Sequence, residues 1–198
     1  EADNRETVLR HAGICGLAGT ATPSELKSLY RHSSRALRIA AVVALRRQRA
    51  FKELTAFLDD PSPQVMSDAM RAIYDEASPQ TFNDHPNVLT ALATSLDPSR
   101  PAPVNVRAIA ANRRLGTIEA ARRVAAFLTT PKLDPALRVE ALYSLESWPD
   151  ASTLDPMDGR HFPVPQGNPE VLGQVVGPEI WSLAHDSHDK VSRRVIAL

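Results

Sequence analysis

The stretch LRIAAVVAL at residues 37–45 carries the pattern that decides the fold. An aliphatic anchor, Leu37, is followed by small residues four and seven positions later, Ala41 and Ala44, and by Leu45 at the eighth position. This spacing places all four side chains on one stripe of an α-helix. Small residues on the stripe let a neighbouring helix approach closely. The stretch therefore predicts a helix that packs tightly against other helices.

The same spacing recurs along the chain, with further anchors at Leu9, Val65, Val106 and Leu137. The complete copies are Leu9, Gly13, Gly16, Leu17, then Val65, Ala69, Ala72, Ile73, and then Leu137, Ala141, Ser144, Leu145. An arginine often follows the anchor, as in Leu37-Arg38 and Leu137-Arg138. The copy at Val106 keeps Ala110 but then departs, because Arg113 and Arg114 stand where a small and an aliphatic residue are expected.

Turn-forming residues and second helices fill the intervals between these copies. Asp, Ser and Pro precede the helices at residues 60–63, 101–103, 134–135 and 186–189, where Asp or Ser can cap and Pro is tolerated in the first turn. Second helices are predicted at about 23–31, 50–58, 87–96 and 118–128. Two antiparallel helices per unit predict an all-α, right-handed α-solenoid of about five helix pairs, one domain over residues 1–198.

An insertion of residues 148–169 interrupts the fifth pair. Prolines at 149, 156, 163, 165 and 169 exclude a continuous helix, and helical signals return only at 170–176 and 178–184. Long irregular segments in compact domains are often functional. The candidate binding residues are therefore Trp148, Asp155, Asp158, Arg160, His161 and Phe162.

Three interpretations of the insertion stay open. Arg160 and His161 could meet an anionic or carbonyl-bearing partner. Alternatively, Asp155, Asp158 and the Gly159 carbonyl are hard oxygen ligands for a divalent cation, although the full calcium-loop spacing is missing. In the third interpretation, Trp148 and Phe162 pin the insertion to the solenoid while the acids cap turns.

The charge balance argues against a dedicated nucleic-acid binder. Lys plus Arg and Asp plus Glu number 23 each, whereas phosphate binding usually needs a positive excess. Arginine pairs at 46–47, 113–114, 122–123 and 193–194 still leave an alternative, an arginine-lined face that binds nucleic acid. The simpler interpretation is a solvated helix face that pairs with acids.

No catalytic residue, cofactor or metal site is expected. The single cysteine, Cys15, excludes an internal disulfide and a CxxC site, and its place on the first stripe predicts that it is buried. His185, Asp186, His188 and Asp189 have ligand chemistry, but they align with the inter-repeat turn at 59–64 and are expected to form a turn. No run of about 18 apolar residues predicts a membrane span.

The turns at 58–65 and 186–191, together with the copy at 37–45, resemble those of the HEAT-repeat, armadillo-like family. The resemblance implies a curved superhelix whose surface binds other macromolecules. We therefore expect a non-catalytic scaffold for a protein partner or for neighbouring domains. Residues 147–149, 158–160 and 173–178 resemble the helical section of large bacterial secreted dehydrogenase-like proteins, which also contain a propeller and a cytochrome c-type domain. That second resemblance implies a periplasmic or secreted protein, as opposed to a cytoplasmic one. Since the sequence starts without Met and stops inside a helical pattern, we expect a fragment of a longer chain.

Overall fold

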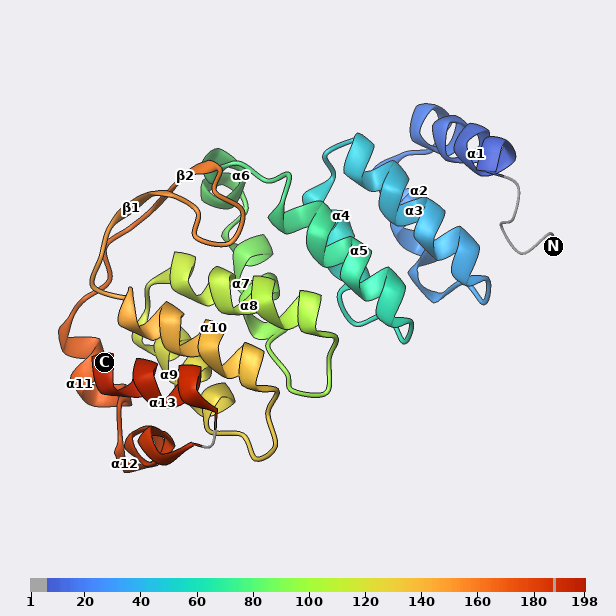
Figure 1. Ribbon diagram of the computed structural model, residues 1–198. Coiled ribbons are helices and arrows are strands. Elements are labelled where there is room, and N and C mark those ends of the chain that lie inside the picture. Colours follow the sequence, from blue (N-terminus) through green and yellow to red (C-terminus); the bar gives the residue numbers. More distant parts are fainter. Residues whose placement is uncertain (1–6, 187) are drawn as a thin grey trace. The chain divides into compact units, whose positions relative to one another are not determined.

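The computed structural model describes residues 7–186 and 188–198 (Figure 1). Nearly every element in these ranges is a helix. The contacts group the described residues into two compact units, one up to Ala91 and one from Leu92 to Leu198. Each unit is described separately below.

The first unit contains helix pairs at the predicted places. Its elements are α1 (Thr7–Thr20), α2 (Pro23–Ser28), η1 (Leu29–Arg31), α3 (Arg35–Arg47), α4 (Phe51–Leu54), η2 (Thr55–Phe57), α5 (Pro63–Tyr74) and α6 (Pro79–Asp84), and α7 (Pro86–Thr94) begins in it. The second helices predicted at 23–31 and 50–58 each consist of a short α-helix that continues as a 3-10 turn. Helix α6 was not predicted, although Ser78 caps it and Pro79 opens it.

The predicted burial of the small-residue stripe is confirmed in α3 and α5. Ala41, Ala44 and Leu45 are buried in α3, and the equivalent residues of α5 are buried as well. Helix α3 packs against both α1 and α5, so the close approach that small residues permit occurs on both sides of it. The anchors differ, because Val65 is buried whereas Leu37 is 38% exposed.

The predicted burial of the α1 stripe, and with it of Cys15, is wrong. Leu9 is 71% exposed and Cys15 is exposed, whereas Ile14 is the buried residue of this helix. The physical reason is a rotation of the helix about its axis, since α1 meets α3 on the side of Ile14 instead of on the predicted stripe. The Cys15 thiol accepts a hydrogen bond from Arg47 of α3, at 2.9 Å.

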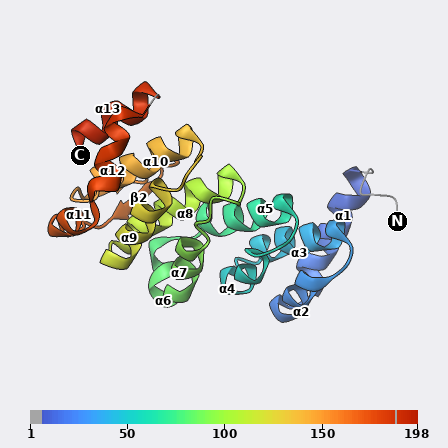
Figure 2. The ribbon, with the colours of Figure 1, turned by 90° about the horizontal axis from the view of Figure 1, so that it is seen from below.

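The second unit contains one core shared by its helices. Its elements are α8 (Ala102–Leu115), α9 (Ile118–Leu128), α10 (Pro135–Glu146), β1 (Ser152–Leu154), β2 (His161–Val164), α11 (Glu170–Val175), α12 (Pro178–Ser182), η3 (Leu183–His185) and α13 (Asp189–Ala197). Helix α10 contacts α8, α9 and α13, an arrangement that can be followed in Figure 2. Leu142, Leu145 and Trp148 are fully buried in this core.

An arginine–aspartate pair recurs at equivalent places in the two units. Arg38, next to the anchor of α3, donates from Nε and Nη2 to the Asp60 carboxylate at 2.7 and 3.1 Å. Arg138, next to the anchor of α10, donates from Nη1 to Asp186 at 2.8 Å. Each aspartate lies in the turn before the next helix, so the predicted equivalence of the 59–64 and 186–189 turns is supported. Ser187, a member of the second turn, lies outside the described residues.

Candidate interaction groove

The insertion forms a β-hairpin instead of the predicted irregular loop. Strands β1 and β2 pair antiparallel, with Ser152 opposite Val164 and Leu154 opposite His161. The turn closes through hydrogen bonds from the Asp155 N–H to the Arg160 carbonyl and from the Gly159 N–H to the Asp155 carbonyl, both 2.8 Å. The positive φ of Gly159, 70°, is a conformation that favours glycine in such a turn.

A buried ion pair fixes the tip of the hairpin to α8. Arg114 donates from Nη2 and Nε to Oδ2 of Asp155, at 2.6 and 3.0 Å. Its guanidinium also lies 3.7 Å from the centre of the buried Phe162 ring. The other carboxylate oxygen, Oδ1, accepts the backbone N–H groups of Met157 and Asp158. Asp155 therefore holds the turn in shape and holds it against the helix.

The preceding arginine fixes the base of the hairpin. Arg113 donates to the Pro165 carbonyl at 2.9 Å, to the Ser147 carbonyl at 3.0 Å, and to the Asp150 carbonyl. Burial lowers the pKa of the Arg113 guanidinium, and the nearby Asp150 carboxylate opposes that effect. Three carbonyls from both ends of the insertion thus converge on one side chain.

Trp148 completes the anchor at the base. Its indole is fully buried in the core of the second unit, and the Arg113 guanidinium lies 5.6 Å from its ring centre. Gly167 packs directly on it, because a β-carbon at position 167 would lie 2.4 Å from Cδ1 of the indole. Only a glycine fits this contact without displacement.

The six candidate binding residues consequently fall into two groups. Trp148, Asp155 and Phe162 are buried and hold the hairpin in place, as the pinning interpretation describes. Asp158, Arg160 and His161 lie at the surface of the hairpin, where Arg160 Nε donates to Asp158 at 2.7 Å. Because the Asp155 carboxylate is occupied by Arg114 and the turn, it is not available to a cation. No group of three or more potential ligands for a metal ion occurs in residues 7–186 and 188–198.

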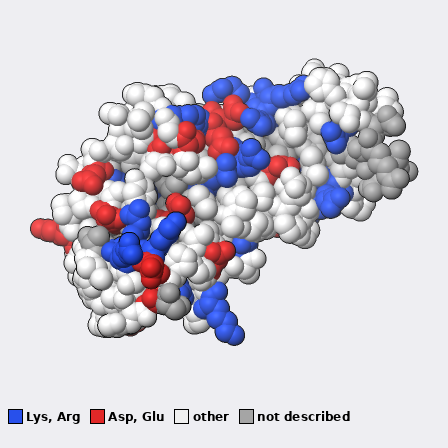
Figure 3. All heavy atoms as spheres, in the orientation of Figure 1, with Lys and Arg blue, Asp and Glu red and all other residues white. Residues whose placement is uncertain are grey.

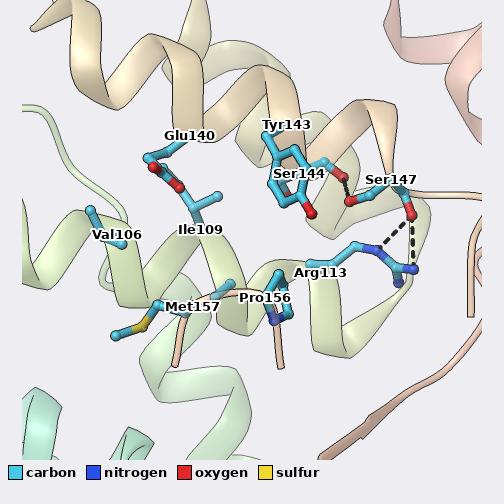
Figure 4. Close-up of a pocket in the computed structure, with 10 residues that line it drawn as sticks. Val106, Ile109, Arg113, Glu140, Tyr143, Ser144, Ser147, Pro156 and Met157 are labelled. Carbon is cyan, nitrogen blue, oxygen red and sulfur yellow. Dashed lines mark hydrogen bonds between the residues drawn. The ribbon is translucent and has the colours of Figure 1, made fainter. Parts of the chain in front are cut away.

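Between the docked hairpin and the helices lies a groove, which we call the hairpin groove. Figure 4 shows its first hollow, with side chains from α8 and α10 facing the hairpin turn. This hollow has a volume of about 30 Å³, and a second hollow of about 200 Å³ shares four of its residues. The first is lined by Val106, Ile109, Ala110, Arg113, Glu140, Tyr143, Ser144, Ser147, Pro156 and Met157, and the second adds Asp150, Ala151, Ser152 and Val164.

The walls of the first hollow are apolar, with a few polar groups among them. Val106, Ile109 and Met157 supply aliphatic and thioether surface, and Glu140 is exposed at its edge (Figure 4). Tyr143 is 40% exposed, and the Arg194 guanidinium lies over its ring, 4.8 Å from the centre. Sequence reasoning missed this groove. The available signal was the departure of Arg113 and Arg114 from the repeat pattern.

Three arginines of the predicted pairs are either paired with acids of their own unit or buried. Arg46 pairs with Glu76 in the first unit, and Arg193 pairs with Asp189 at 3.7 Å in the second. Arg113 is buried under the hairpin. Figure 3 shows acidic and basic side chains interspersed on the face in view. The predicted alternative, an arginine-lined face for nucleic acid, is not favoured by this distribution.

Comparison with known proteins identifies the fold. A designed armadillo repeat protein matches with a TM-score of 0.53 over 93% of this chain and 83% of its own chain, at 18% identity. The chain is therefore an all-α solenoid of the armadillo and HEAT type, as predicted. No family model and no curated protein matches the sequence, so the resemblance to dehydrogenase-like proteins has no support from these comparisons. Among the described residues, no helix has the length and hydrophobicity required to cross a bilayer.

Proposed function

We propose that the chain is a non-catalytic protein-interaction or domain-organising scaffold, and that the hairpin groove is its contact site. The observation that carries the proposal is the way Arg113 and Arg114 fix the hairpin beside α8 and α10, which leaves a preformed groove next to Tyr143. Preformed surfaces bind with a smaller ordering cost than mobile ones. Stacked repeats present extended surfaces of the kind that partner proteins use.

Site-specific photo-cross-linking tests this function in the cells to which the protein is native. A p-benzoylphenylalanine in place of Tyr143 should yield a protein adduct of defined mass. The same group in place of Arg122, an exposed residue of α9 outside the groove, serves as the matched control and should not yield that adduct. Equal adducts from both positions, no adduct, or a nucleic-acid adduct would contradict the proposal.

No specific observation favours the alternative function, binding of nucleic acid. Arg46 and Arg193 are paired with acids inside their own unit, and Arg113 is buried. A solenoid that bound phosphates would need such side chains free and directed to one surface.

A further inference from the structure

We infer that the hairpin groove binds an extended peptide segment that places one basic side chain in the first hollow. The inference rests on the proposed function and specifies its ligand. The site lies wholly within the second unit, between α8, α10 and the hairpin turn. Since the hairpin forms one wall, the site depends on the insertion and not on the repeat pattern alone.

The size of the groove favours a peptide over a compact ligand. The first hollow, at about 30 Å³, is far below the roughly 300–1,000 Å³ of pockets that enclose small molecules. The second hollow shares Arg113, Tyr143, Ser147 and Pro156 with it, so the two adjoin. An extended segment directs alternate side chains to one face, about 7 Å apart, and can therefore place one in each hollow.

The chemistry of the first hollow selects a side chain with an apolar stem and a cationic end. Val106, Ile109 and Met157 offer apolar contact, and the carboxylate of Glu140 lies at the edge (Figure 4). Glu140 is exposed, so its charge is accessible to a ligand. Lys and Arg combine methylene groups with a terminal charge, and they bury the stem while the charge stays near water.

A polar group inside the same hollow suits the backbone of a peptide. Ser144 lines the hollow, and its buried hydroxyl has no hydrogen-bond partner in the part of the chain that the structure describes. A buried hydroxyl without a partner is energetically unfavourable. A backbone N–H or carbonyl of the bound segment would supply that partner.

The three methionines of the chain allow a direct test by NMR. Protein labelled with ¹³C at the methionine methyls gives signals for Met157 in the groove and for Met66 and Met70 in α5. The probe is a capped peptide of sequence Gly-Ser-Ala-Lys-Ala-Ser-Gly. Three comparison peptides replace the lysine by norleucine, which keeps the stem, by diaminopropionic acid, which keeps the charge, or by glutamate.

We expect the lysine peptide to shift the Met157 signal saturably while the Met66 and Met70 signals stay in place. Each comparison peptide should bind at least about fivefold more weakly, because it loses the stem contact, the charge contact or both. In the variant Glu140→Lys the preference should reverse toward the glutamate peptide. Glu119→Lys, a change of another exposed glutamate in the same unit, should leave the affinities unchanged.

Several outcomes would overturn the inference. Equal binding of the norleucine peptide, or an unchanged affinity in Glu140→Lys, would show that the groove does not recognise a basic side chain. A Met157 shift that depends on protein concentration alone would indicate a second copy as the occupant, and a shift caused by an oligothymidylate would indicate nucleic acid. If no peptide shifts Met157 but position 143 still cross-links to a protein, the ligand class is wrong and the scaffold proposal stands. If cross-linking from position 143 also fails, the scaffold proposal and the inferred peptide ligand are both wrong.

Discussion

The guanidinium of Arg114 lies 2.6 Å from the carboxylate of Asp155, which follows it by 41 positions, and both side chains are almost completely buried. The pair connects the helix of one repeat to an insertion in the next. A buried charge that loses its partner is strongly destabilising, more so than the pair itself is stabilising. Loss of either partner should therefore destabilise the whole docked hairpin in the second unit.

Removal of one partner should loosen the hairpin. In Arg114→Met the Asp155 carboxylate stays buried without its cation, and we expect a loss of about 3–5 kcal/mol in the free energy of unfolding. The double variant Arg114→Met with Asp155→Asn should regain part of the lost free energy of unfolding, because Asn keeps an oxygen for the Met157 and Asp158 N–H groups. Urea denaturation of the single and double variants measures both effects. Additive losses in the double variant would show that the pair is not coupled.

The contact between Gly167 and Trp148 should tolerate no larger residue. In Gly167→Ala the new β-carbon would meet the indole at 2.4 Å and the Trp148 carbonyl oxygen at 2.5 Å, so the chain must shift. We expect thermal unfolding to show a destabilisation of about 1–3 kcal/mol. Gly173→Ala in α11 is the control, since no atom lies within 4 Å of its added β-carbon. That variant should be neutral or slightly more stable.

The two arginine–aspartate pairs should differ in strength. Arg38 makes a two-pronged contact with Asp60, which is almost fully buried, whereas the Arg138 contact to Asp186 is single and less buried. Lysine cannot reproduce the two-pronged geometry. Arg38→Lys should lose about 2–3 kcal/mol and Arg138→Lys about 1 kcal/mol. Hydrogen exchange of the α3 and α10 amides locates each loss, and equal effects would contradict the ranking.

The turn before α8 should weaken in acid. Hydrogen bonds from the side chain and then the backbone of Ser99 lower the pKa of Asp97 below its ordinary value of 3.8. Because the folded pKa is depressed, the stabilisation is complete well above pH 3.8 and is lost as the pH falls through the folded pKa. NMR titration of the Asp97 carboxyl carbon measures this pKa. Ser99→Ala should raise it toward 3.8, and an unchanged midpoint would refute the cause.

Much of the fold was predictable because small residues at this fixed spacing are typical of closely packed helices. Ala41, Ala44 and Leu45 identify a tightly packed helix from the sequence alone, and the structure buries all three. The rotation of α1 was not predictable, since Ile14 and Leu9 lie on different faces and either could be the buried one. Only the packing partner decides between them.

The candidate site was predictable only in part. The prolines locate the insertion, but strands of three and four residues, one containing Pro163, have too weak a pattern to predict a hairpin. The hairpin groove depends on contacts between α8, α10 and the turn, which are far apart in the sequence. Arg113 and Arg114 signalled such a contact without identifying its partner.

Repeat proteins are commonly treated as modules that can be exchanged one at a time. The docked hairpin breaks that modularity at one place. Replacing the repeat of α8 by a consensus copy would put a small and an aliphatic residue at 113 and 114, and would remove the arginine donors to Asp155 and to three backbone carbonyls of the following repeat. When repeats of this array are grafted, deleted or recombined, residues 102–169 should therefore be kept together as one segment.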